Sequence, residues 1–102
     1  MYTIDDIKHL LSSTDVIMGN DKHRFSRVAD TANVDAYTLD WIHASNRDPL
    51  CYLRKSKAKL IIVPRSIEGD LSTDDLDKTI IVSNNPMLLF SRIARELFVL
   101  KP

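Results

Sequence analysis

The sequence predicts an α/β domain in which a small, partly parallel sheet is flanked by helices. Two short and mostly apolar runs, at residues 60–63 and 79–82, are typical of strands that are covered on both faces. A helical pattern precedes the first run, another follows the second, and a polar connection at residues 65–78 separates them. This order favours helices packed on the faces of a sheet over an all-α or all-β fold.

The N-terminal half predicts one helix followed by three strands. Thr3 is a suitable N-cap, and apolar residues at helical spacing extend from there to Leu11. The strands that follow carry β-favouring side chains and are expected at residues 16–18, 25–28 and 37–42. The first two are separated by a turn-forming Gly-Asn-Asp sequence at residues 19–21, so we expect them to form a hairpin. Residues 29–36 are expected to be a loop.

Two prolines mark the starts of two further helices. Asp48 precedes Pro49, and Asn84 or Asn85 precedes Pro86. An Asp or Asn side chain at the N-cap accepts a backbone hydrogen bond, and proline suits the first helical position because its missing N–H costs nothing there. We therefore expect one helix from Pro49 to about residue 56 and a second from Pro86 onward.

Length and charge limit the classes of function. The 102 residues suit a single domain, and the 14 basic residues balance the 14 acidic ones. A formal net charge of zero argues against a nucleic-acid partner and against a polybasic membrane anchor. The single cysteine, Cys51, cannot form an internal disulfide, and no apolar stretch reaches the roughly 20 residues that span a bilayer. These features predict a cytoplasmic domain without a transmembrane segment.

No reaction centre and no metal site are predicted. The three histidines lack the spacing of zinc ligands; we expect His9 and His23 to be exposed, whereas His43 is a candidate for a ligand site. Cys51 lies within a predicted helix and is expected to pack as a small hydrophobe. With two glycines in the whole chain, a phosphate loop is excluded. Three carboxylates in the polar connection are expected to be solvated: Asp74, Asp75 and Asp77.

A ligand-binding groove is better supported. Tyr37, Trp41 and Tyr52 surround the predicted junction between strand and helix, at residues 42–49. Ligands of open α/β sheets bind at the carboxyl ends of the strands, where the chain leads into the following helices. There, aromatic rings can stack on a flat base, and the amide of Asn46 offers both a donor and an acceptor. The alternative is that Trp41 belongs to the core and Asn46 helps to start the helix, and the residue types alone favour this alternative.

The order of these segments resembles the N-terminal domain of UDP-3-O-acylglucosamine N-acyltransferases. The resemblance extends from about Val28 to Pro102 and rests on residues 38–42, 56–63 and 80–86, followed by Leu-Phe-Ser at 89–91. It implies a fold like the uridine-binding domain of the Mur ligases. In the family, this domain packs against a left-handed β-helix of hexapeptide repeats.

The resemblance also implies a site for the base. The aromatic residue that holds the uracil matches Trp41. Aligning the family's Ser-Asn with Ser45 and Asn46 gives the base-reading role to Asn46 and places Pro49 where the family has a stacking Tyr. An ungapped alignment with relatives that carry Leu-Asp-Trp-Ile-Asn gives the role to His43 instead. Two rings are candidates to replace the missing one: Tyr37 and Tyr52.

The family transfers an acyl group from acyl carrier protein to a sugar amine during lipid A (lipopolysaccharide) synthesis. A histidine in the β-helix domain is the general base, and nothing in residues 1–102 matches that domain. We therefore expect recognition of a UDP-linked amino sugar without catalysis by this chain alone. The resemblance implies that a β-helix domain of the same chain or of a partner chain completes the enzyme. Three cations are candidates for contacts with the phosphates: Arg47, Arg54 and Lys55. The alternative is a free-standing protein-interaction module that has lost nucleotide binding, which Pro49 favours.

Overall fold

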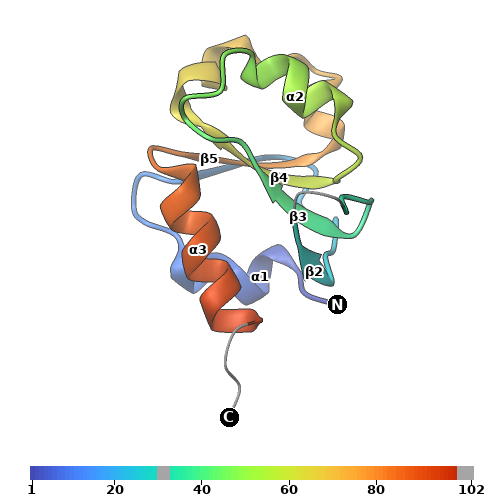
Figure 1. Ribbon diagram of the computed structural model, residues 1–102, viewed down its shortest axis with the longest axis vertical. Helices are drawn as coiled ribbons and strands as arrows, with labels where there is room; N and C mark the ends of the chain where they lie inside the picture. Colours follow the sequence, from blue (N-terminus) through green and yellow to red (C-terminus); the bar gives the residue numbers. More distant parts are fainter. Residues whose placement is uncertain (30–32, 99–102) are drawn as a thin grey trace.

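The computed structural model describes residues 1–29 and 33–98, which form a five-stranded sheet in the order β1-β5-β4-β3-β2 (Figure 1). The strands are β1 (Val16–Gly19), β2 (Arg27–Val28), β3 (Thr38–Trp41), β4 (Leu60–Pro64) and β5 (Thr79–Ser83). β1 pairs antiparallel with β5, and the remaining neighbours pair in parallel. The predicted α/β class with a mixed, partly parallel sheet is confirmed.

Helices cover both faces of this sheet, which gives three layers (Figure 1). On one face lie α1 (Ile4–Ile7) and α3 (Pro86–Leu97), and on the other lies α2 (Pro49–Lys55). Three shorter 3₁₀ segments complete the fold, at Lys8–Leu10, Arg65–Asp70 and Asp75–Asp77. None of the helices in the described part of the chain is long and apolar enough to span a membrane.

The central strands are buried on both faces because each contributes to two cores. In β4, Leu60 and Ile62 pack with α1 and α3, whereas Ile61 and Val63 pack with α2. All five residues of β4 and all five of β5 are buried. Successive side chains of a strand point to opposite faces, so a strand between two helical layers needs apolar residues at nearly every position. This requirement explains the two apolar runs in the sequence.

The predicted helix starts are confirmed. The carboxylate of Asp48 accepts a hydrogen bond from the backbone N–H of Cys51 at 3.1 Å, and Pro49 is the first residue of α2. Asn85, rather than Asn84, caps α3 by accepting from the N–H of Leu88 at 3.1 Å. Both caps satisfy donors that a helix leaves unpaired at its first turn.

The predicted hairpin is wrong. β1 pairs with β5, and β2 lies beyond β3 at the opposite edge of the sheet. Gly19 does turn the chain, with φ +79°, but residues 20–26 then cross to the far edge. Phe25 becomes fully buried on the way and pairs with Tyr2 in an isolated bridge. Pairing with the buried strand β5 and burial of Phe25 remove more apolar surface from water than a short exposed hairpin would.

The polar connection holds α2 in place. Asp75 is 7% exposed and accepts hydrogen bonds from Nε and Nη2 of Arg54, each at 3.0 Å. The expected solvation is therefore wrong for Asp75, because Arg54 and the N–H of Ser72 replace its water, whereas Asp74 and Asp77 are exposed. Lys78 caps the other end of α2, where its Nζ donates to the carbonyl oxygens of Leu53 and Ser56. Its partial burial lowers the pKa of the Lys78 ammonium.

Candidate functional site

Two adjoining cavities lie where β3 ends and the chain leads into α2. They have volumes of about 560 and 330 Å³. Three side chains line both of them: Asp40, Asn46 and Tyr52. The larger cavity is also lined by Val34, Asp48, Cys51, Lys55, Ser56 and Lys57. The smaller cavity is also lined by Ala29, Trp41, Ile42 and His43. Volumes in this range suit small-molecule ligands, and the three shared residues show that the two cavities are direct neighbours.

A buried carboxylate forms the floor of this site. Alternation along β3 directs Asp40 toward the α2 face, and the residue is 2% exposed. Tyr52 Oη donates to both carboxylate oxygens, at 3.0 and 3.2 Å, and Ser56 Oγ donates to Oδ2 at 2.9 Å. These donors, with the backbone N–H of Trp41 at 2.8 Å, offset the cost of burying the charge.

Burial, together with the charge of Asp40 and its hydrogen bond, raises the pKa of Tyr52 to about 12. At neutral pH, the phenol therefore stays protonated and remains a donor to Asp40. This contact orients the Tyr52 ring, which lines both cavities.

The loop between β3 and α2 presents N–H donors. The backbone N–H of Ser45 donates to Nδ1 of His43 at 3.0 Å, so the neutral ring carries its proton on Nε2. Similarly, Oδ1 of Asn46 accepts from the N–H of Asp48 at 2.8 Å. Within residues 1–29 and 33–98, the amide NH₂ of Asn46 has no partner and is available to a ligand. Both side chains thus offer donors in the smaller cavity.

Trp41 belongs both to the core and to the site. Its ring stacks on Phe90 of α3, with centroids 5.5 Å apart and an interplanar angle of 28°. The ring of His43 lies 5.7 Å away, tilted by 49°. Because Phe90 covers one face of the indole, a ligand in the smaller cavity meets the remaining surface beside His43. The core and ligand interpretations of Trp41 therefore do not exclude each other.

The structure brings four of the five predicted site residues to the smaller cavity: Trp41, His43, Asn46 and Tyr52. Both residues that competed for the base-reading role, His43 and Asn46, lie there. Tyr37 lines neither of the two cavities and is 52% exposed. Pro49 also lines neither cavity. Of the two tyrosines that could replace the stacking ring, only Tyr52 lines the cavities.

Of the three cations predicted to contact phosphates, only Lys55 lines a cavity. Arg54 is held by Asp75, and Arg47 lines neither cavity. Lys55 lines the larger cavity together with Lys57, which residue-type reasoning did not select. Residue-type reasoning also missed Asp40. A carboxylate between Leu39 and Trp41 in a predicted strand would have indicated a special role, since charged side chains are rarely buried without partners.

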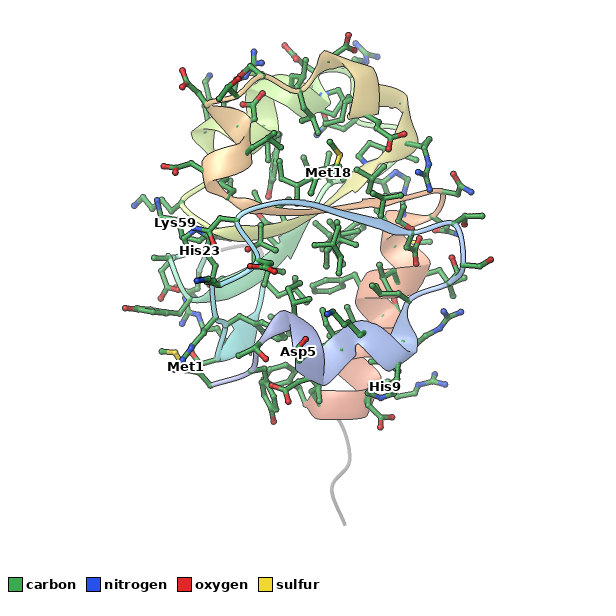
Figure 2. The ribbon with its side chains drawn as sticks, turned by 180° about the vertical axis from the view of Figure 1, so that it is seen from behind. Met1, Asp5, His9, Met18, His23 and Lys59 are labelled. Atoms are coloured by element: carbon green, nitrogen blue, oxygen red, sulfur yellow. The ribbon has the colours of Figure 1, made fainter. Side chains whose placement is uncertain are left out.

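The two remaining histidines, His9 and His23, line neither of these cavities. His9 is exposed and lies 4.0 Å from Glu96, whereas Nε2 of His23 contacts the carbonyl oxygen of Asp77 at 2.7 Å. His23 is half-buried rather than exposed, because this contact packs it against the connection. Figure 2 shows the two histidines on well-separated parts of the molecule. In the part of the chain that the structure describes, no three His, Cys, Asp or Glu side chains are arranged to hold a metal.

No protein-family model and no curated protein matches this chain. The likeness to UDP-3-O-acylglucosamine N-acyltransferases therefore stays a prediction from the sequence.

Proposed function

We propose that this chain recognises the nucleotide end of a UDP-linked amino sugar. It would be the substrate-binding domain of an N-acyltransferase similar to those of lipid A synthesis. The observation that supports this proposal is the convergence of Trp41, His43, Asn46 and Tyr52 on one cavity with a second cavity beside it. Binding energy from the unreactive nucleotide would position the sugar amine for acylation elsewhere. A β-helix domain, in the same or a partner chain, would bind acyl carrier protein and supply the general base.

The smaller cavity suits a pyrimidine base. Its volume of about 330 Å³ accommodates a flat ring, and Trp41 and Tyr52 offer aromatic surface. The amide NH₂ of Asn46 and the Nε2–H of His43 are donors, which match the carbonyl oxygens of uracil. The sequence suggested that Asn46 reads the base with both a donor and an acceptor. Because Asp48 N–H occupies its Oδ1, we propose that Asn46 reads the base with its NH₂ alone.

A fluorescence titration tests this proposal. Trp41 is the only tryptophan, so its emission reports on the site directly. We expect saturable quenching by UMP and by UDP-N-acetylglucosamine, a large loss of affinity in Asn46→Ala, and an unchanged affinity in the control Tyr37→Ala. Tighter binding of dTMP would indicate a deoxythymidine-linked sugar instead. No response to any nucleotide at millimolar concentration contradicts the proposal.

A second candidate function, a protein-interaction module, is favoured by one observation. Met87 and Leu88, adjacent on α3, are 50% and 51% exposed. Exposed apolar side chains are ordinary on folded proteins, and two of them do not make a large patch. We therefore rank this function below nucleotide recognition. This function predicts that the unmodified chain gives no response in nucleotide titrations. It also predicts that Met87→Ser with Leu88→Ser abolishes partner binding.

A further inference from the structure

We propose that the larger cavity carries a negative charge near the start of α2 and positive charges near its end, and that this arrangement orients the ligand. The diphosphate of the ligand lies against Lys55 and Lys57, and its hydroxyl-bearing ring lies against Asp48. This inference rests on the proposed nucleotide function and concerns the part of the ligand that the base site does not hold.

The cavity follows one side of α2. Asp48, Cys51, Tyr52 and Lys55 all line it, and Cys51 and Tyr52 each lie three or four residues from Asp48 and from Lys55, so the four share one side of the helix. Asp48 caps the first turn of α2, and Lys55 is its last residue. A rise of 1.5 Å per residue separates these two ends by about 10 Å. A ribose linked to a diphosphate is an elongated group of comparable length, so both ends of this side of the helix can contact one ligand.

The positive end has two ammonium groups available. Neither Lys55 nor Lys57 forms an ion pair or a side-chain hydrogen bond with another described residue, and both line the cavity. Two other cations beside α2 are engaged elsewhere: Arg54 binds Asp75, and Lys78 donates to the carbonyl oxygens that end α2. Lys78 thereby offsets the negative end of the helix dipole at the place where the phosphates would lie. An anionic ligand group is therefore attracted to Lys55 and Lys57.

The negative end is Asp48. One of its oxygens accepts the N–H of Cys51, and the other has no hydrogen-bond or ion-pair partner among residues 1–29 and 33–98, although the charge of Arg54 acts on this carboxylate. Asp40 is the other carboxylate of the cavity, but it is 2% exposed and its oxygens accept from Tyr52 and Ser56. The carboxylate that remains free to accept a ligand hydroxyl is thus that of Asp48.

This polarity fixes the order of the ligand. A base in the smaller cavity lies beside Asn46, which lines both cavities. The ribose diol then reaches Asp48, and the diphosphate continues toward the lysines. The reverse orientation would place phosphate against a carboxylate, which like-charge repulsion disfavours. The site thus takes a nucleoside diphosphate in one direction and leaves the sugar beyond Lys57.

The positive end is tested by comparing the dissociation constants of uridine and UDP, followed by Trp41 fluorescence. For the unmodified chain, we expect UDP to bind about tenfold or more tightly than uridine, since charge-assisted contacts are the strong ones. In Lys55→Ala with Lys57→Ala, this ratio should fall to near one while the affinity for uridine is unchanged. Lys22→Ala, an exposed lysine outside both cavities, is the matched control. An unchanged ratio in the double variant overturns the inference alone. A chain that binds neither uridine nor UDP overturns the proposed function as well.

The negative end is tested with Asp48→Asn, which keeps a capping side chain and removes the charge. The unmodified chain should bind UMP several-fold more tightly than 2′,3′-dideoxy-UMP, and Asp48→Asn should remove this preference. An equal midpoint of thermal unfolding for the two chains would show that the cap is intact. If Asp48→Asn retains the preference for the diol, the proposed orientation is wrong.

Discussion

Tyr52 donates its phenolic hydrogen bond to both carboxylate oxygens of Asp40, at 3.0 and 3.2 Å, and thereby ties α2 to β3. Asp40 is buried, and the Tyr52 ring lines both cavities of the candidate site. One contact therefore stabilises a buried charge and fixes the position of an aromatic ring that a ligand would meet. Because the partners come from consecutive elements of a β-α-β unit, the shape of the site depends on how α2 docks on the sheet.

This contact predicts a late tyrosine titration. With its pKa raised to about 12, Tyr52 should ionise last as the tyrosinate absorbance rises. A raised folded-state pKa gives stability that is present below the ordinary tyrosine pKa of 10.0 and lost as the pH rises toward 12. Tyr52→Phe should remove the late step and destabilise the fold by about 1 kcal/mol, whereas Tyr37→Phe should leave the late step in place. A late step that persists in Tyr52→Phe contradicts this account.

The pair of Arg54 and Asp75 predicts an acid-sensitive anchor for α2. Hydrogen bonds from Arg54 are the main cause that lowers the pKa of Asp75 from 3.8 to about 2. A depressed folded-state pKa gives stability that is present above the unfolded value and lost as the pH falls. Arg54→Ala should therefore lower the midpoint of thermal unfolding at pH 7, and the difference should shrink between about pH 4 and pH 2. Arg47→Ala serves as the control, and a pH-independent difference would refute the ion-pair explanation.

Gly19 ends β1 in a conformation that other residues rarely adopt. Its φ is +79°, and an added Cβ would lie 2.3 Å from the carbonyl oxygen of Lys78 and 2.7 Å from that of Leu76. Gly19→Ala should destabilise the fold by about 2 kcal/mol or more, measured by urea unfolding. Gly69→Ala is the matched control, because a Cβ there meets nothing within 4 Å. Equal stabilities for the two variants would contradict the described geometry of the β1 edge.

The donor role of Asn46 predicts an unusual effect of an isosteric change. In Asn46→Asp, the side chain still accepts from the N–H of Asp48, so the loop should keep its conformation. The donor that faces the cavity is replaced by a charged acceptor, so UMP affinity should fall by about tenfold or more. Circular dichroism and thermal unfolding check the fold, and Trp41 fluorescence measures the affinity. Unchanged UMP binding would show that the amide NH₂ does not contact the base.

The strands and helices of the second half were predictable because their signals are local. Apolar runs define β4 and β5, and an Asp-Pro and an Asn-Pro sequence start α2 and α3. The hairpin prediction was wrong because strand pairing is a long-range property. Gly19 signals a turn, but nothing local shows that β1 pairs with β5.

The same distinction applies to the site. Residue types made Trp41 and Asn46 candidates, since aromatic rings and amides can bind bases, but taken alone they favoured a core tryptophan and a helix-starting asparagine. The roles of Asp40 and Lys57 depend on which face of β3 meets α2 and on which cations are already paired. The separation of Tyr37 from both cavities likewise depends on the turn that precedes β3, where Asp35 accepts from the N–H of Tyr37.

The most direct test of nucleotide recognition is a ¹⁵N-labelled NMR titration with UDP-N-acetylglucosamine. The indole N–H of Trp41 and the side-chain amide of Asn46 each give a separate signal. We predict that both shift in a saturable way, together with the backbone signals of residues 42–57, while α1 is unaffected. Shifts confined to other surfaces, or no shift at millimolar ligand, would contradict the assignment of this site to a nucleotide.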